Sequence, residues 1–557
     1  MQRICSIFSV VAGVAAMVIP AQSAQACGGF FCSQTPIDQS GESILFAIDE
    51  EAGTVSTHVQ ISYEGSAEDF AWIVPVPEIP DLFLSTDDLF VQLDARLSAQ
   101  FWLDWNYEGE CDMDMWGYTY SDVDLASSSS EGGVTVIATE VVGPYDTVVL
   151  SANSSDELLT WLQEHNFDLP DTLDPVLSPY VASEAYFVAL RLSNDRDVGD
   201  LAPLGMTYQA DQAMIPIQLT SIAATADMRL EVYVLGKERA VPENYLHVQI
   251  NQAAIDWWNF GSNYEDVITL AADEAGGHAF ATDYSGDTTS LDDLLVWPGR
   301  FDLSVFDGVT DPVLFMDLIM GQFGASQTLL SLLQTHIPLP QALANQGVDE
   351  TTFYNCLSCY EEYLDPSSFD GPAFAADLDT FIVAPLVHAN DMLKAHDKIT
   401  RLTSSISPIE MTIDPAFVFN GDMGDVSQTY EATLVTDCST GLDYDEAPRQ
   451  LELPDGRVIL LPSLRWMEDH DLTDFEFIQE LTTVNAAVIE RTGSSGQPEV
   501  LTDYTHELEA QTSAFNERVR MLFSARGCGG CNTTSPTPAL AWMGLIALAF
   551  LRRRNAA

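Results

Sequence analysis

The spacing of apolar residues changes along the chain, and this change limits the folds that the chain can adopt. The first 250 residues contain short runs in which apolar and polar residues alternate or β-branched residues cluster, a pattern typical of strands. Between residues 253 and 398 the apolar residues recur three or four positions apart, as in helices that pack on a core. The sequence therefore predicts an α+β protein with a β-rich N-terminal half and a mainly helical middle.

Turn and capping residues place the individual elements. The turn at 49–53 between two alternating runs predicts a β-hairpin, and Ser85 followed by two aspartates predicts a helix over 85–98 that Ser85 caps. Further strands are expected at 70–76, 134–142, 147–150, 186–192, 215–219, 230–235 and 458–461. Further helices are expected at 155–165, 313–323, 327–335, 373–397 (kinked at Pro385) and 504–524.

The N-terminal segment has the features of an export signal. Residues 1–26 combine Arg3, an apolar run that is short for a bilayer span, and an Ala-x-Ala sequence at 24–26. This pattern predicts a signal peptide that is cleaved before Cys27. A cysteine at the cleavage site also allows a lipoprotein, but the residues that precede Cys27 do not suit lipid attachment.

The C-terminal segment 527–557 has three parts in a fixed order. The sequence Cys528-Gly529-Gly530-Cys531 comes first, a short apolar run at 539–551 follows, and three arginines come next. Arginines after an apolar helix predict a cytoplasmic tail. The arrangement resembles the MYXO-CTERM and GlyGly-CTERM sorting tails of bacterial surface proteins, which implies a sorting protease that acts at the Cys-Gly-Gly-Cys sequence. The alternative is a simple membrane anchor beside a disulfide, and both place the body in the cell envelope or at the cell surface.

The charge of the chain excludes several classes of partner. Of its 557 residues 84 are acidic and 21 basic, which gives a formal net charge of −63. A field of this sign repels nucleic acids and anionic lipids and attracts cations. A solvated acidic surface is favoured over a dedicated ion store. The hydrophobic fraction of 46% indicates a globular rather than a disordered chain.

The length predicts two to four domains in a chain of this size. Composition and periodicity divide the chain into five parts. The expected parts are a signal peptide at 1–26, a β-rich α+β domain at 27–250, a mainly helical region at 251–400, a mixed α+β region at 401–526, and the tail at 527–557.

The cysteines of the exported body are candidates for disulfides, because export places them in an oxidising compartment. The candidates are Cys27, Cys32, Cys111, Cys356, Cys359 and Cys438. Cys27 and Cys32 are spaced as one local loop, and the other four allow three connectivities. Cys356-Leu-Ser-Cys359 also has redox spacing, but acidic residues follow it and disfavour a thiolate. A structural disulfide is therefore favoured over a redox site or a metal site with Cys111 and Cys438.

Several segments of the body resemble a known family. They are Cys27-Gly-Gly-Phe-Phe-Cys32, Asp69-Phe-Ala-Trp-Ile-Val-Pro-Val-Pro77, and the segments 186–192, 214–219, 239–245, 401–403 and 407–415. Together they resemble the secreted bacterial proteins known as the domain of unknown function 2330. The resemblance implies export and association with the cell surface. It implies no reaction, so no catalytic residues can be carried over.

An aromatic and acidic segment after residue 100 is the main candidate for ligand binding. Its residues are Trp102, Asp104, Trp105, Asp112, Asp114 and Trp116. Aromatic rings beside carboxylates suit sugars, and two carboxylates can hydrolyse a glycosidic bond. The favoured alternative is a β-hairpin whose aromatic residues pack on the body and whose acids face water.

Signals for metals and for common enzymes are weak. The acidic turns 195–200 and 283–293 offer closely spaced oxygens of the kind that calcium binds, but neither completes an EF-hand loop, and ordinary turns are favoured. His396 falls on the apolar stripe of its expected helix, and a core or boundary role is favoured over metal binding there and at His388. The chain contains no zinc-protease helix, nucleophile elbow or phosphate-binding glycine loop. No cofactor is expected apart from calcium at one of the two acidic turns.

These observations support three functional hypotheses. The first is a non-enzymatic binding, adhesion or envelope-structural module that the tail displays at the cell surface. The second is an extracellular hydrolase that acts, for example, on glycans through carboxylates near Trp102 and Trp116. The third is an envelope thiol oxidoreductase that uses Cys356 and Cys359.

Overall fold

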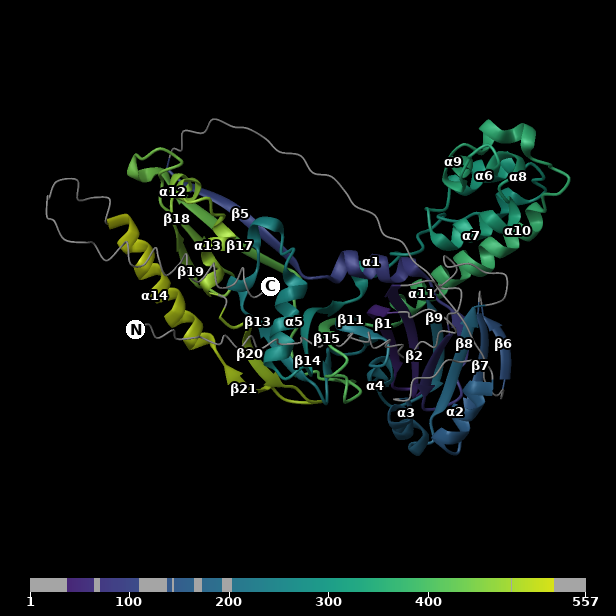
Figure 1. The fold of residues 1–557 in the computed structure, drawn as a ribbon, viewed down its shortest axis with the longest axis horizontal. Coiled ribbons are helices and arrows are strands. Elements are labelled where there is room, and N and C mark those ends of the chain that lie inside the picture. The colour runs from purple at the N-terminus through teal and green to yellow at the C-terminus, as the bar shows by residue number, and fades with distance from the viewer. Residues whose placement is uncertain are drawn as a thin grey trace, which may run out of the picture.

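The structure is a computed structural model of the chain. It describes residues 38–64, 71–109, 138–142, 145–164, 173–192, 203–481 and 483–524. Within these residues the fold is mixed α+β, with a β-rich first half and helices later, as the sequence predicts. One large sheet crosses the molecule, and smaller sheets and helices pack around it (Figure 1).

The large sheet is mixed, with parallel and antiparallel neighbours. Its central strands are β1 (Asp38–Asp49), β2 (Thr54–Glu64), β11 (Ala224–Gly236) and β15 (Lys398–Ile406). Its outer strands are β4 (Asp81–Leu84), β9 (Leu204–Gln209), β13 (Leu246–Ile250), β14 (Ala279–Asp287), β20 (Ala486–Arg491) and β21 (Glu499–Asp503). The order is β21-β20-β13-β14-β15-β11-β1-β2-β9-β4. β1 runs parallel to β11 and β13 parallel to β14, while the other neighbours are antiparallel.

The predicted hairpin at the start of the body is confirmed. β1 and β2 pair up to Asp49 and Thr54, and the Asp49 carboxylate accepts backbone N–H bonds from Glu51 and Ala52 in the turn. The edge of β1 that does not contact β2 pairs with β11, which lies far along the chain. The expected regions 27–250, 251–400 and 401–526 all contribute strands to this one sheet. A strand such as β11, buried on both faces and both edges, needs neighbours from distant segments.

A four-stranded sheet covers one face of the large sheet. It contains β3 (Ala71–Val76), β6 (Ala138–Val142), β7 (Tyr145–Ser151) and β8 (Tyr186–Leu192), in the order β3-β8-β7-β6. Its inner face packs with β1, β2 and β9 in one continuous core. Its outer face packs on α2 (Ser155–Glu164) and α3 (Leu173–Ala182). The layers are therefore sheet on sheet on helix in this part of the molecule.

The strand expected at 215–219 is wrong, because this segment forms a single helical turn, α4 (Ile217–Thr220). Pro216 precedes the turn and has no N–H to donate to a strand. The backbone N–H of Ile215 bonds the Pro415 carbonyl instead. These contacts lie beside a small sheet of β10 (Ala213–Met214), β16 (Ala416–Phe419) and β12 (Ala240–Pro242).

Helices cover the other face of the large sheet. α1 (Asp87–Leu97) and α11 (Ala384–Ala395) pack on β1, β11 and β15, and α5 (Tyr264–Glu274) packs on β13 and β14. The predicted cap at Ser85 is wrong: Thr86 is the N-cap and makes no side-chain cap. The Ser85 hydroxyl instead lies 2.6 Å from a ring nitrogen of buried His58. A tertiary partner has replaced the local cap.

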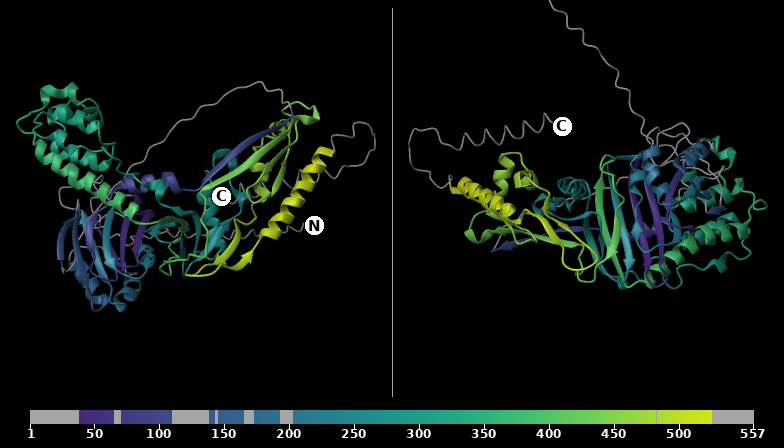
Figure 2. Two further views of the ribbon diagram at one scale, coloured as in Figure 1. Left: turned by 180° about the vertical axis from the view of Figure 1, so that it is seen from behind. Right: turned by 90° about the horizontal axis from the view of Figure 1, so that it is seen from below.

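A helical lobe stands apart from the sheets, at the opposite end of the molecule from α14 (Thr505–Ser524) (Figure 2). It contains α6 (Pro312–Met320), α7 (Gln327–His336), α8 (Gln341–Ala344), α9 (Glu350–Asn355) and α10 (Gly371–Leu378) around its own apolar core. A π-helical turn at 379–383 joins α10 to α11, with Pro385 in the first turn of α11. The predicted helix over 373–397 is therefore interrupted just before its proline, because Pro385 has no N–H to continue the regular bonding.

A second four-stranded sheet combines one strand from the first half of the chain with three strands from the C-terminal region. Its strands are β5 (Gln100–Glu108), β17 (Thr429–Asp437), β18 (Arg449–Glu452) and β19 (Val458–Leu461), in the order β19-β18-β17-β5. The helices α12 (Leu464–Asp469), α13 (Asp474–Ile478) and α14 complete this part. β5 lies parallel to β17, which brings residues 100–108 beside residues 429–437.

No helix in the described part of the chain has both the length and the apolar character that a membrane span needs. The expected signal peptide at 1–26 and the expected apolar tail at 539–551 lie outside the described residues.

Candidate functional site

The aromatic and acidic residues predicted to bind a ligand are only partly described. Trp102, Asp104 and Trp105 lie on β5, while Asp112, Asp114 and Trp116 lie outside the described residues. Trp102 and Trp105 are 49% and 46% exposed and, by strand alternation, point to opposite faces. The Trp102 ring contacts Phe260 edge to face. These residues are spread along a strand that is an edge of its sheet in the described structure.

Two of the predicted cysteines are joined to each other. Cys356 and Cys359 form a disulfide between α9 and the helical turn that follows it, with their Cα atoms 5.3 Å apart. Cys356 is half-buried and Cys359 is exposed. Cys438 is also disulfide-bonded. The remaining candidates lie outside the described residues: Cys27, Cys32, Cys111, and the tail sequence Cys528-Gly529-Gly530-Cys531.

The acidic segment predicted as a possible calcium loop serves separate contacts. Asp283 lies in the sheet opposite Arg401, Asp287 accepts the N–H of Thr289, and Asp293 pairs with Lys394. Residues 195–200 lie outside the described part of the chain. Among the described residues, no three His, Cys, Asp or Glu side chains converge as a metal site would require.

A cavity lies between the large sheet and the four-stranded sheet that covers it. It has about 30 Å³ of free volume, enough for about two water molecules. Apolar and aromatic side chains from both sheets form most of its wall, among them Ile44, Phe46, Val59, Trp72, Val74, Met206 and Ile215. The polar side chains in the wall are Gln39, Glu42, Thr57, Tyr208 and Thr220. Few polar groups in an apolar wall are typical of small-molecule sites.

Glu42 is the ionisable group that distinguishes this cavity. Its side chain points from β1 into the space between the sheets and is 6% exposed. One carboxylate oxygen accepts a hydrogen bond of 3.2 Å from the Gln39 amide. Burial raises the pKa of Glu42 to about 7, and the bond from Gln39 lowers it only in part. Further along the same sheet, on β2 and β9, the hydroxyls of Thr57 and Tyr208 bond each other at 3.0 Å, and burial raises the pKa of Tyr208.

The cavity was not predicted from the sequence, although two of the segments that resemble the family line it. Trp72 to Val76 comes from the first of these segments, and Met214 to Leu219 contributes from another. A weak signal for Glu42 is nevertheless present in the sequence. This residue occupies the first position of the alternation Glu42, Ile44, Phe46, Ile48, whose other members form the apolar face of β1. A carboxylate at the head of an apolar face indicates a buried acid.

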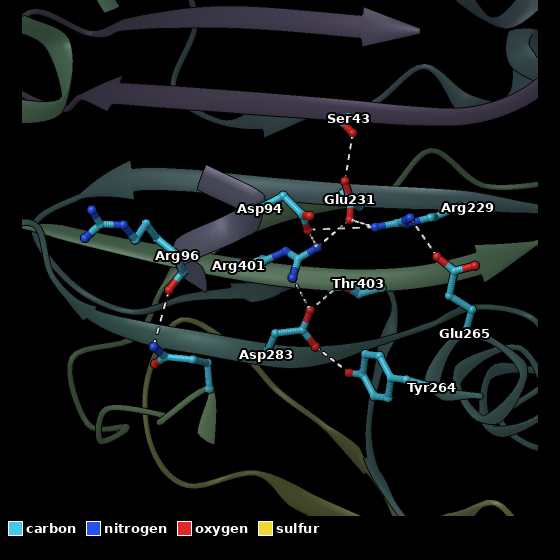
Figure 3. Close-up of polar contacts among 11 residues, drawn as sticks. Ser43, Asp94, Arg96, Arg229, Glu231, Tyr264, Glu265, Asp283, Arg401 and Thr403 are labelled. Carbon is cyan, nitrogen blue, oxygen red and sulfur yellow. Dashed lines mark hydrogen bonds and ion pairs between the residues drawn. The ribbon is translucent and has the colours of Figure 1, made fainter. Parts of the chain in front are cut away.

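The opposite face of the same strands holds an ion cluster around Arg401 (Figure 3). The Arg401 guanidinium bonds Asp94 on α1 at 2.7 Å, Glu231 on β11, and Asp283 on β14 at 3.3 Å. Arg229 bonds Glu231 from the other side and Glu265 on α5 at 2.7 Å.

Hydroxyl groups complete the bonding of the cluster carboxylates. Ser43 donates its hydroxyl to Glu231 at 2.9 Å, and the hydroxyls of Tyr264 and Thr403 donate to Asp283. These contacts join β1, β15 and α5 to the strands that hold the two acids. Both arginines are occupied by carboxylates, so the cluster offers no free cation for an anionic ligand.

The charges of the cluster follow from these contacts. Burial opposes ionisation of Glu231, but Arg401 and Arg229 outweigh it and lower the pKa of this carboxyl. Burial raises the pKa of Asp283, which Arg401, Thr403 and Tyr264 oppose without cancelling it. The same carboxylates raise the pKa of Arg401 against its own burial. The cluster therefore connects α1 and α5 to the large sheet through ion pairs.

A hydroxyl, an imidazole and a carboxylate also line up at the other end of the large sheet. Thr282 Oγ1 lies 3.0 Å from His247 Nε2, and His247 Nδ1 lies 2.8 Å from Glu490. This order occurs in hydrolases that use a hydroxyl nucleophile. All three side chains are buried, Arg239 also contacts the Thr282 hydroxyl, and the cavity between the sheets does not include them. The arrangement ties β20 to β13 and β14.

Comparison with known protein families gives a match over about half of the chain. A family model described as "Uncharacterized protein conserved in bacteria (DUF2330)" matches residues 20–300. The matched region includes all of the residues named above in the cavity wall, and it ends before Arg401. No curated protein and no solved structure matches the chain.

Proposed function

The chain belongs to the DUF2330 family of uncharacterized proteins conserved in bacteria, and from this premise we propose that it is an exported, surface-displayed binding module without enzymatic activity. The cavity between the two sheets is its binding site. The observation that carries the proposal is the position of Glu42, a buried acid in the wall of an otherwise mainly apolar cavity. An apolar pocket that holds a group with a perturbed pKa is the default site for a small ligand.

The contrast with the other polar clusters supports binding rather than catalysis. The carboxylates around Arg401 are engaged by arginines and hydroxyls, and the Thr282 hydroxyl is buried away from the cavity. Within the described lining of the cavity there is no Ser, Cys, Lys or His, and Glu42, the group that could act as a base, bonds the Gln39 amide rather than a hydroxyl. Glycoside hydrolysis needs two carboxyl groups about 5–10 Å apart in one cleft. Glu42 is the one carboxylate in the described cavity wall.

Substituting a larger side chain into the cavity tests the binding site. Val74→Phe adds a ring to the cavity wall, while Val91→Phe makes the same change at an exposed position on α1. We expect a set of small amines, alcohols and acids to contain ligands that bind the wild-type chain and the Val91→Phe variant but not the Val74→Phe variant. Saturation-transfer NMR detects such weak binding. Equal binding by all three proteins would place the ligand site elsewhere.

Display at the surface needs a separate experiment, because it depends on the tail and not on the cavity. Replacing Cys528 and Cys531 by alanine removes the expected processing site. We expect this variant to be exported but to lose labelling by a membrane-impermeant reagent on intact cells. A chain with Cys356 and Cys359 replaced by serine should be labelled as the wild type is. Unchanged labelling of the tail variant would contradict sorting through this sequence.

The thiol oxidoreductase remains a second candidate, because Cys359 is exposed and bonded to a cysteine three positions away. A redox role requires the reduced pair to react quickly with a disulfide at neutral pH. Reduction followed by timed alkylation and mass spectrometry measures this reactivity. We expect slow alkylation, because Glu361 and Glu362 follow the pair directly and disfavour a thiolate. Alkylation much faster than that of a free cysteine would favour the redox candidate.

A further inference from the structure

We propose that the cavity between the sheets binds a small organic ammonium ion, with the Glu42 carboxylate as the counter-ion and the apolar wall as the second contact. This inference rests on the proposed function and names the chemical class of the ligand.

Glu42 differs from the other buried acids because no arginine or histidine side chain lies beside it within the described structure. Four carboxylates are buried among the described residues: Glu42, Glu231, Asp283 and Glu490. Glu231 and Asp283 contact Arg401, and Glu490 contacts His247. The described lining of the cavity contains no Arg, Lys or His, and the hydrogen-bond partner of Glu42 is the neutral amide of Gln39. Glu42 is therefore the buried acid whose counter-ion the described chain does not supply.

The wall around Glu42 has the chemistry that an organic cation requires. Ile44, two positions along β1 from Glu42, and its β2 partner Val59 line the same cavity. The N–H groups of an ammonium ion can donate to the carboxylate of Glu42. Its carbon atoms contact the apolar wall.

Cavity size and net charge narrow the ligand further. The free volume is about 30 Å³, which admits about two water-sized groups. Methylammonium, which has one carbon and one nitrogen atom, fits this space, while a fatty acid or a sugar ring does not. The formal net charge of −63 also raises the concentration of cations near the molecule and lowers that of anions. Size and charge thus point to the same class of ligand.

The proposal predicts a pH dependence of binding. The titratable side chains in the described lining are Glu42 on β1 and Tyr208 on β9, and the elements that close the cavity, β2, β3 and α4, contribute none. Burial raises the pKa of Glu42 to about 7 in the empty protein, so Glu42 is mostly protonated at pH 6 and mostly ionised at pH 8. Binding of an ammonium ion should release about one proton at pH 6 and almost none at pH 8, and should weaken about ten-fold from pH 8 to pH 6.

The experiment compares methylammonium chloride with methanol, which has a similar size and no charge, by saturation-transfer NMR on the intact chain at pH 8 and pH 6. Two variants are tested beside the wild type. Glu42→Gln removes the charge and keeps the size, and Glu499→Gln makes the same change at an exposed position on β21. We expect methylammonium to bind the wild type and Glu499→Gln at pH 8, about ten-fold more weakly at pH 6, and not to bind Glu42→Gln.

The outcomes separate this inference from the function on which it rests. If methanol binds as well as methylammonium and pH has no effect, the cavity binds neutral ligands: the ammonium inference fails and the proposed function stands. If neither compound binds and Val74→Phe changes the binding of no compound in the wider set, both fail. Undiminished binding of methylammonium to Glu42→Gln also overturns the inference. Should Glu42→Gln fail to fold, the pH series on the wild type decides alone.

Discussion

Glu42 and Glu231 are buried to the same degree on opposite faces of the same two strands, yet their carboxyl groups behave in opposite ways. β1 and β11 pair so that Glu42 lies beside Leu230 and Ser43 beside Glu231, and the two acids are 6% and 7% exposed. The pKa of Glu42 rises to about 7 because of burial, while two arginines lower the pKa of Glu231. The difference shows that arginine partners can outweigh burial for a carboxyl in this sheet, as they do at Glu231 but not at Asp283.

Buried acids on the two faces of the large sheet therefore have different roles. On the helix-covered face, carboxylates and arginines join α1, α5, β11, β14 and β15 into one cluster. On the sheet-covered face, the uncompensated acid faces a cavity. A buried charge without a partner is costly and is seldom kept for stability alone. This contrast is the basis of the binding function proposed for the cavity.

Removing Arg401, the central arginine of the cluster, should give the largest change in unfolding free energy. Arg401→Met introduces an unbranched apolar side chain and removes the guanidinium, which leaves Glu231 and Asp283 buried without that partner. Breaking a buried ion pair in this way costs about 3–5 kcal/mol of unfolding free energy. Urea unfolding at pH 7 measures the loss. Arg491→Met, which breaks an exposed pair with Glu499, should cost under about 1 kcal/mol.

A small loss on Arg401→Met would show that the cluster carboxylates already take up protons in the native protein. In that case the contrast between the faces would disappear. The pH dependence distinguishes the two cases: the Arg401→Met variant should be stabilised by acid over the range in which its unpaired carboxylates become protonated.

Substitution of Glu42 should give the second largest effect on the unfolding free energy. The pH dependence of this effect has the opposite sign to that expected for a paired acid. Its native pKa is about 7 and its ordinary value 4.5. The stability that it contributes is fully present below pH 4.5 and is lost as the pH rises to about 7. The expected change is about 3 kcal/mol, since one pKa unit corresponds to about 1.4 kcal/mol. Relative to the wild type, Glu42→Gln should therefore gain about that amount from pH 4.5 to pH 8.

Chemical unfolding of both proteins at several pH values gives this difference directly. Subtracting the two curves cancels the other acids, which titrate alike in the two chains. A difference that stays constant from pH 4.5 to pH 8 would mean that Glu42 ionises normally, and its role as an uncompensated acid would be disproved.

The sequence predicted local elements better than it predicted the ion cluster around Arg401 or the buried acid Glu42. The β1–β2 hairpin and most helices depend on local alternation, turns and caps, so their signals lie within a few residues. Glu231 meets Ser43 and Arg401 across 188 and 170 positions of the chain. Nothing local specifies such pairings. The local spacing Arg229-Leu-Glu231 indicates only that both side chains share a face.

The errors in the sequence-based predictions have the same origin. Ser85 has the preferred chemistry of a helix cap, but His58 on β2 takes its hydroxyl. The run 215–219 has strand-like composition, but Pro216 and the contact of Ile215 with Pro415 produce a helical turn. In both cases a tertiary or backbone constraint decided against the local pattern.

Glu490 offers an intermediate case, in which the partner is a histidine. Its carboxylate bonds His247 Nδ1 at 2.8 Å, and this bond lowers the pKa of Glu490 against its burial. Glu490→Gln keeps the acceptor oxygen and removes the charge. Hydrogen bonds to charged groups contribute about 1 kcal/mol more than neutral ones, so we expect a loss of about 1 kcal/mol in urea unfolding at pH 7. A loss as large as that of Arg401→Met would place Glu490 in the same class as Glu231.

Arg229 should give the smallest effect, although it contacts the same carboxylate as Arg401. The Arg229 side chain is 44% exposed, whereas that of Arg401 is 3% exposed. Water screens a half-exposed pair, so Arg229→Gln should cost under about 1 kcal/mol and the cost should shrink in high salt. Unfolding at low and high ionic strength measures both. A large, salt-independent loss would mean that Glu231 depends on both arginines equally. The charge of a buried acid would then depend on the number of its cationic partners rather than on one buried partner.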